Sequence, residues 1–294
     1  MSILINKDTT VAVWGMTGGY GIQQTKNMMS YGTKVVAGIS ASRGGEEVNG
    51  VPIYDTVYEA MKETEINTGI IYVPPARAKD AALEAIESGI KVLMIATEGI
   101  PLHDTMLIRR FSEERGTWII GPNTVGIITP GECLIGSLAS DYAIKGRVGL
   151  VTRGGTIAVE LTRIMSAAGI GQSTCVGSGG DKVIGKNTAL YLQLFEQDPE
   201  TDVVVLNGEI GGYKEYECAK VISGMKKKVI AYILGRCAPE GKRMGHIGAI
   251  IGGKSEGFEE KREALRQAGA IVVDTPWLMV EELNKLGMRQ RVIV

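Results

Sequence analysis

Short apolar runs of strand type alternate with amphipathic, helix-type stretches along almost the whole chain. In the first part, the predicted strands are Val11–Trp14, Val35–Ile39, Gly69–Val73, Lys91–Ile95 and Thr117–Ile120. The predicted helices between them are Ile22–Ser30, Val57–Lys62, Ala76–Ser88 and Asp104–Arg115. Most of these helices end at a glycine, the residue that most easily takes the left-handed conformation at a helix end. This alternation predicts an α/β fold with a doubly wound parallel sheet.

The alternation stops over Pro122–Gly146, a segment with two prolines and several glycines, which we interpret as the connection between two domains. It then restarts. The later predicted strands are Arg147–Thr152, Ser173–Val176, Val203–Asn207, Lys228–Leu234 and Ala270–Val273, and the later helices are Thr156–Ala168, Asn187–Gln197, Tyr213–Met225, Gly257–Ala268 and Pro276–Leu286. The apolar strands suit a sheet that is buried on both faces. We therefore predict a Rossmann-like domain over residues 1–125 and a flavodoxin-like, doubly wound parallel-sheet domain over residues 126–294.

The composition argues against several classes of function. The formal net charge is −1, so no basic surface for nucleic acid is expected. The four cysteines are scattered and have no clustered histidine, which argues against a structural zinc site and fits a reducing compartment. The N-terminus lacks the features of a signal peptide, and no apolar run approaches the ~20 residues of a membrane helix. We expect a cytoplasmic protein with no membrane or nucleic-acid partner and no metal of its own.

A glycine-rich loop, Trp14–Gly21, follows the first predicted strand and opens the first helix. This is the position of a Rossmann phosphate-binding turn, where backbone N–H groups at a helix N-terminus approach a diphosphate. An NAD site would have an acidic residue after the second strand, but the cation Arg43 stands there. A cation favours a phosphate on or near the ribose, so NADP and coenzyme A both fit. Alternatively, Arg43 is an ordinary solvated charge.

Further glycine-rich loops follow four strands of the second half. They are Thr152–Thr156, Gly177–Asp181, Gly208–Gly212 and the loop that contains His246. Because ligands of open α/β sheets bind beyond the carboxyl ends of the strands, these loops are predicted to form one site.

His246 is the candidate catalytic residue of that site. An isolated histidine is more often structural, but this one lies in a glycine-flanked loop, within plausible reach of Glu209. A carboxylate beside an imidazole fixes its tautomer and raises its basicity, which prepares a nucleophilic nitrogen. His103, near a predicted helix start, has no such setting and is interpreted as structural.

Four motifs resemble the α subunit of succinyl-CoA synthetase and its relatives: Thr97–Pro101, Gly121–Asn123, Gly208–Gly212 and Gly241–His246. The resemblance covers nearly the whole chain. It implies that the first domain binds coenzyme A and that His246, oriented by Glu209, is phosphorylated. It also implies a large partner subunit of the ATP-grasp (β) type that binds ATP and Mg²⁺, in a hetero-oligomer such as a heterotetramer.

The resemblance assigns the remaining site residues position by position. The coenzyme A positions are Thr17, Gly18, Gly19, Tyr20, Arg43, Val73, Pro74, Pro75, Thr97 and Glu98. The phosphate and substrate positions are Asn123, Arg153, Gly154, Gly155, Thr156, Gly179 and Gly180. The family usually has Ser-Gln at Gly19-Tyr20 and lysine at Arg43, so the individual contacts of that first loop stay open.

Other positions bear on the small-molecule carboxylate that is activated. Val13–Met16, Asn123–Gly126, Glu215-Tyr216 and Cys237 look more like ATP-citrate lyase. The loop Thr152–Thr156 has glycine where the family usually has serine, which leaves room for a tricarboxylate. The sequence ends near Val294 without a citryl-CoA lyase module. The expectation is therefore the small subunit of an ADP-forming citryl-CoA synthetase, with succinate as the alternative acid.

Two other classes of function remain as alternatives. A coenzyme A- or nucleotide-responsive binding protein would keep the first glycine loop but would need neither Glu209 nor His246. An NADP-dependent oxidoreductase would bind NADPH at that loop, but it would not explain the motifs Thr97–Pro101 and Gly241–His246.

Overall fold

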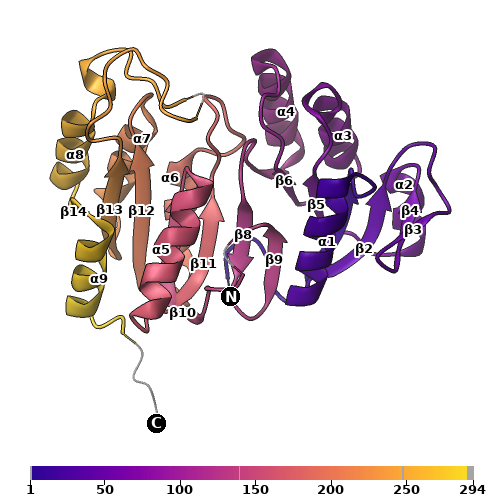
Figure 1. The fold of residues 1–294 in the computed structure, drawn as a ribbon, viewed down its shortest axis with the longest axis horizontal. Coiled ribbons are helices and arrows are strands. Elements are labelled where there is room, and N and C mark those ends of the chain that lie inside the picture. Colours follow the sequence, from indigo (N-terminus) through magenta and orange to yellow (C-terminus); the bar gives the residue numbers. More distant parts are fainter. Residues whose placement is uncertain (1, 139, 247, 290–294) are drawn as a thin grey trace, which may run out of the picture.

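The computed structural model describes residues 2–138, 140–246 and 248–289. Two α/β units lie side by side in this part of the chain, and each is built on a seven-stranded sheet (Figure 1). The predicted fold class is confirmed. None of the helices among the described residues has the length and apolar character needed to cross a bilayer.

The first sheet has the strand order β3-β4-β2-β1-β5-β6-β7. Its strands are β1 (Thr10–Trp14), β2 (Lys34–Ile39), β3 (Glu47–Val48), β4 (Val51–Tyr54), β5 (Thr68–Ile71), β6 (Val92–Ile95) and β7 (Trp118–Ile120). The helices are α1 (Gly19–Tyr31), α2 (Val57–Glu63), α3 (Pro75–Glu87) and α4 (Leu102–Arg115). All neighbouring strands run parallel except β3 and β4, which form a hairpin that we did not predict. Its turn is Asn49-Gly50, both with positive φ, which is a strong hairpin signal.

The second sheet has the order β14-β13-β12-β10-β11-β8-β9. Its strands are β8 (Gly126–Thr129), β9 (Cys133–Gly136), β10 (Lys145–Thr152), β11 (Gln172–Gly177), β12 (Val203–Glu209), β13 (Lys228–Leu234) and β14 (Ile271–Val273). The helices are α5 (Gly155–Ala167), α6 (Thr188–Gln197), α7 (Lys214–Ile222), the 3₁₀ turn η1 (Lys254–Glu256), α8 (Phe258–Gln267) and α9 (Pro276–Lys285). Strands β10 to β14 are parallel, as predicted, and β8 runs antiparallel to β11.

The segment Pro122–Gly146 is more than a connection, so our interpretation of it was incomplete. It contains the antiparallel strands β8 and β9, whose residues are all buried. Strand β9 packs against α1 of the first unit. There the Thr33 hydroxyl donates to the carbonyl of Leu134 at 2.8 Å and accepts from its N–H at 3.0 Å. These strands are short and apolar rather than alternating, because they are covered on both sides.

The register of the second sheet aligns the strand ends that carry the glycine-rich loops. Thr152 at the end of β10 pairs with Asn207 of β12 on one side and with Gly177 of β11 on the other. Glu209 at the end of β12 pairs with Leu234 at the end of β13. The loops after these four strands therefore leave the sheet at one edge, as expected for parallel strands.

Candidate active site

His246 and Glu209 form a hydrogen-bonded pair at this edge. The imidazole Nδ1 lies 2.8 Å from Glu209 Oε2 and 3.2 Å from Oε1. Glu209 is buried, while 28% of the His246 side chain is exposed. An Nδ1–H that donates to the carboxylate leaves the lone pair on Nε2, the nitrogen on the opposite side of the ring. The pair thus presents a nucleophilic nitrogen.

Two glycines make room for the imidazole. A Cβ built on Gly180 would lie 2.8 to 3.1 Å from Cδ2, Cγ and Nε2 of His246. A Cβ built on Gly154 would lie 3.3 Å from Cε1 and 4.0 Å from Nε2. The ring is therefore packed against backbone from the loops after β10 and β11. Glu209 belongs to the third predicted loop, so all four predicted loops meet at this imidazole.

The N-terminus of α5 opens toward this imidazole. A cavity of about 390 Å³ is lined by Gly154, Gly155, Thr156, Ile157, Glu160, Leu234 and His246. The N-cap residue of α5 is Gly154, and no side-chain hydrogen bond caps the helix within the described chain. Uncapped N–H groups at a helix N-terminus, together with the helix dipole, favour an anion. The arrangement can stabilise a phosphate carried on Nε2.

Behind Glu209 lies a buried ionic cluster of Arg153, Glu215 and Lys261. The Arg153 Nη1 donates to Glu215 Oε1 at 3.1 Å, and the Lys261 ammonium is paired with the other oxygen of the same carboxylate. Lys261 also donates to the carbonyls of Glu209 and Gly211, both at 2.8 Å. Burial alone would raise the pKa of Glu215, but Arg153 and Lys261 outweigh it and lower that pKa. The cluster holds the backbone on both sides of the turn that carries Glu209.

Glu215 and Lys261 were not predicted from the sequence as members of this cluster. A signal for Lys261 exists: it lies between Phe258 and Leu265 on the buried stripe of α8, at helical spacing, where a lysine is unusual. The side chain of Arg153, predicted near the phosphate, is buried and its guanidinium is directed into the cluster.

The loops of the two units meet at Asn123, which has a φ of +56°. Its side-chain amide donates to Asp181 Oδ1 at 3.0 Å, and its backbone N–H donates to the carbonyl of Thr97 at 3.1 Å. A Cβ on Gly179 would lie 2.5 Å from the carbonyl oxygen of Pro122, so the contact between the units needs a glycine there. A second link joins Arg243 of the His246 loop to Glu98 of the first unit, at 3.7 Å.

The first glycine loop is shaped by close backbone contacts. Gly15 has a φ of +83°, and its Cβ would lie 3.0 Å from the backbone of Tyr72 and Val73. Gly18 is the N-cap of α1, again without a side-chain cap among the described residues, and a Cβ on Gly19 would meet nothing within 4 Å. The turn therefore leaves open space and N–H donors in front of α1, which fits a diphosphate.

The other predicted coenzyme A residues surround this turn. Thr97 donates its hydroxyl to the carbonyl of Val73 at 2.7 Å, and Pro74 and Pro75 begin α3 beside it. The ring of Tyr20 packs edge-on against that of Tyr72, with centroids 5.3 Å apart. Thr17 follows β1 and Glu98 follows β6, so both lie beyond the carboxyl ends of parallel strands of the first sheet.

Arg43, a predicted coenzyme A residue, and His103, interpreted as structural, have plainer surroundings. Arg43 is exposed and forms an ion pair with Glu46, so its guanidinium already has a counter-charge. His103 is exposed in the first turn of α4. Within the described ranges, no group of three or more His, Cys, Asp or Glu side chains is arranged to hold a metal ion.

Comparison with known proteins places this geometry in a family. Residues 6–99 match the family model for a CoA binding domain, and residues 151–271 match the model for CoA-ligase. The chain is 46% identical to succinate–CoA ligase [ADP-forming] subunit alpha 1 of Archaeoglobus fulgidus, over 97% of this chain and 98% of that one. It is 47% identical to succinate–CoA ligase [ADP-forming] subunit alpha of Methanothermobacter thermautotrophicus, over 98% of each.

The chain belongs to the family of succinate–CoA ligase α subunits. Its enzyme class is therefore that of the acid–thiol ligases, its first unit contains the CoA binding domain, and an α subunit implies a β-type partner. The resemblance inferred from the sequence motifs is confirmed at this level.

Solved structures agree with this α-subunit fold. ATP citrate lyase from Methanothrix soehngenii, in complex with citrate and coenzyme A, superposes with a TM-score of 0.89 at 24% identity, over 99% of this chain and 53% of that longer one. A dinucleotide-forming acetyl-coenzyme A synthetase 1 of Ca. Korarchaeum cryptofilum superposes with a TM-score of 0.72 at 20% identity, over 92% of this chain and 58% of that one. At these identities the likeness is one of fold.

Proposed function

We propose that this chain is the CoA-binding α subunit of an ADP-forming succinate–CoA ligase in which His246 is the phosphorylated residue. The observation that carries the proposal is the His246–Glu209 pair, with Nδ1 2.8 Å from the carboxylate, beside the uncapped N-terminus of α5. The named relatives, 46% and 47% identical along nearly their whole length, support succinate as the acid. They favour our alternative over citrate, the acid that we expected first.

In this mechanism Nε2 of His246 takes the γ-phosphoryl group of ATP, and ADP leaves from the partner subunit. Glu209 holds the proton on Nδ1, so the lone pair stays on Nε2. The N–H groups of Gly155 and Thr156 stabilise the phosphate charge. The phosphoryl group then passes to the carboxylate of the acid, which forms an acyl phosphate and restores the imidazole. Coenzyme A, when bound, supplies the thiol that displaces phosphate from the acyl group.

The coenzyme A site is proposed on the first unit. The open turn at Gly18 and Gly19 would take the diphosphate, with Thr17 and Tyr20 beside it. The segment Val73–Pro75 and the pair Thr97-Glu98 would continue the site toward His246, since Glu98 already contacts the loop that carries that histidine. Arg43 would have to leave Glu46 to reach a ribose phosphate.

We propose the two domains that the sequence predicts: residues 1–125 bind coenzyme A, and residues 126–294 carry the phosphohistidine. The first sheet ends with β7 at Ile120 and the second begins with β8 at Gly126, which supports a boundary near residue 125. The last residues of the second predicted domain, 290–294, lie outside the described chain. ATP and Mg²⁺ would bind to a large ATP-grasp subunit, in a cytoplasmic hetero-oligomer such as a heterotetramer.

The proposal is tested by phosphorylation of the complex of the two subunits with γ-labelled ATP. The wild type should take up acid-labile phosphate, the His246→Asn variant should take up none, and His103→Asn serves as the control because His103 is exposed on α4. Labelling of His246→Asn at the wild-type level would refute the mechanism.

The acid is tested on the same phosphoenzyme. Succinate with coenzyme A should release the label and form succinyl-CoA. Citrate is the second candidate, because Gly154, which lines the cavity at the N-terminus of α5, carries no side chain where the family usually has serine. Release by citrate and not by succinate would overturn the choice of acid and leave the phosphohistidine mechanism standing.

A further inference from the structure

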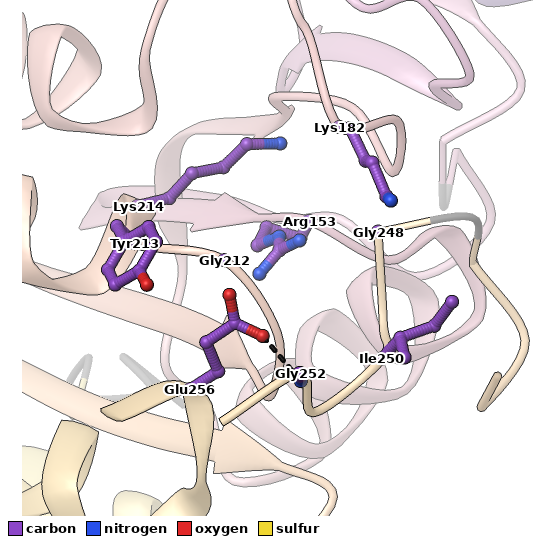
Figure 2. Close-up of a pocket in the computed structure, with 9 residues that line it drawn as sticks. All are labelled: Arg153, Lys182, Gly212, Tyr213, Lys214, Gly248, Ile250, Gly252 and Glu256. Carbon is purple, nitrogen blue, oxygen red and sulfur yellow. Dashed lines mark hydrogen bonds between the residues drawn. The ribbon is translucent and has the colours of Figure 1, made fainter. Parts of the chain in front are cut away.

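A second cavity, of about 390 Å³, lies against the segment Gly248–Gly252 (Figure 2). It shares no lining residue with the cavity at the N-terminus of α5 or with the one beside Glu209 and Met244. One of its walls belongs to the same loop as His246, and its opposite wall is the start of α7. The phosphohistidine mechanism makes no use of this space.

Three cationic side chains reach this cavity from separate parts of the chain. Figure 2 shows Arg153 at its floor, with Lys214 and Lys182 on two sides. Arg153 is 3% exposed, and its Nε has no hydrogen-bond partner among the described residues. For Lys182 and Lys214, the described residues include no carboxylate within ion-pair distance. Arg153 is already paired with Glu215, so the lysines of this cavity, Lys182 and Lys214, are the cations whose side chains remain open to an added acceptor.

Lys214 is the most unusual of the three. Its ammonium donates to the backbone carbonyl of Asp181 at 2.6 Å, which leaves two N–H groups for another acceptor. Burial, and then the charge of Arg153, lower the pKa of Lys214 to about 7, although Glu215, Glu209 and Asp181 act in the opposite direction. A lysine held this way gains most when a negative group enters the cavity.

The carboxylate of Glu256 also lines the cavity. It accepts a hydrogen bond from the N–H of Gly252 at 2.6 Å, as the dashed line in Figure 2 shows, and so it closes the turn of the wall. The volume lies in the range of small-ligand sites, and three donors on different walls match a compact anion better than a long chain.

We propose that this cavity is a second anion site, which binds a compact oxyanion with two negative charges through Arg153, Lys182 and Lys214. Inorganic phosphate and a short dicarboxylate share this chemistry. A bound dianion supplies a counter-charge for Lys182 and Lys214 and an acceptor for the Nε of Arg153, which has no hydrogen-bond partner among the described residues. Because Gly248, Ile250 and Gly252 form the wall, the anion contacts the loop that carries His246.

The test is calorimetric titration of the full-length chain with inorganic phosphate and, separately, with succinate. The variants are Lys182→Gln, Lys214→Met and, as the control, Lys220→Gln, which removes an exposed lysine of α7. Each cavity variant should weaken binding about ten-fold or more, the effect of one charge-assisted hydrogen bond, and the control should bind as the wild type does. Lys182 is exposed, so its replacement should leave the fold intact.

Proton uptake gives an independent readout. At pH 7.5 to 8, binding should take up a fraction of a proton, because an anion raises the pKa of Lys214, and Lys214→Met should abolish this uptake. Weakening seen with only one of the two anions supports the site and identifies the ligand class. Equal isotherms for the wild type and both cavity variants, with either anion, would overturn the proposal, as would the absence of saturable binding.

Discussion

Replacing Gly180 with alanine places a methyl group against the imidazole of His246. The added Cβ would lie 2.8 Å from Cδ2 and 2.9 Å from Cγ, about 0.6 Å closer than the 3.4 Å at which ordinary contact begins. The neighbouring atoms on this side are ring atoms of His246, so the ring must move. It is held by Glu209, whose Oε2 lies 2.8 Å from Nδ1.

The expected effect follows from the hydrogen bond that this movement strains. A shift of this size lengthens the Nδ1–carboxylate contact beyond good geometry, and a hydrogen bond to a charged group contributes about 1.5–3 kcal/mol. If that contribution is lost in the transition state, phosphorylation slows by roughly ten- to a hundred-fold. The free energy of unfolding should change much less, because the ring is partly exposed and can swing outward.

The assay is the initial rate of phosphoenzyme formation by the complex of the two subunits with γ-labelled ATP. The matched control is Gly253→Ala, at the residue before η1, where an added Cβ meets nothing within 4 Å. This variant should form the phosphoenzyme at the wild-type rate. Urea unfolding of both variants separates a local effect from a loss of fold. A wild-type rate for Gly180→Ala would refute the argument that the packing of this glycine positions the imidazole.

Three further predictions concern the groups around that pair. Lys261→Met should lower the free energy of unfolding by about 3–5 kcal/mol, because Glu215 and two backbone carbonyls lose their buried partner. Urea unfolding of this variant and of the exposed control Lys285→Met measures the difference. A loss of stability within about 1 kcal/mol of the control would contradict the prediction. The folded pKa of Lys214 lies below its ordinary value of 10.5, so between about pH 7 and 10 the unfolded chain binds the extra proton. Stability relative to Lys214→Met should therefore rise with pH by at most about 1.4 kcal/mol per unit, and a flat difference over that range would disprove it. Glu209→Gln should slow phosphorylation by about ten-fold or more while coenzyme A affinity stays the same; unchanged labelling kinetics would rule out the orienting role.

Much of the fold could be predicted from local patterns. The strands of the parallel sheets were located within a few residues, because buried parallel strands are apolar runs bounded by glycines. The β3–β4 hairpin was missed despite Asn49-Gly50 at its turn. Strands β8 and β9 were missed for another reason: their apolar character has meaning only once α1 covers β9. A four-residue apolar run in a glycine-rich segment is ambiguous without that partner.

The candidate site divides in the same way. The glycine-rich loops and their position at one sheet edge were predicted, and the structure places Glu209 in hydrogen-bond contact with His246, as expected. The direction of the Arg153 side chain was not predictable, because it depends on Glu215, which lies 62 residues further along the chain. The link between Asn123 and Asp181 across 58 residues is of the same kind.

The sequence by itself determined the class of fold and the family, and it predicted the pair of His246 and Glu209, because strand periodicity, glycine turns and short motifs are local properties. Only the tertiary structure decided which charges share a buried environment. Lys261 lies 46 residues from Glu215, and both are removed from water together. Desolvation and Coulomb interaction depend on distance in space and not along the chain, so the ionic cluster behind Glu209 and the cation-lined cavity beside the His246 loop appear only once the chain is folded.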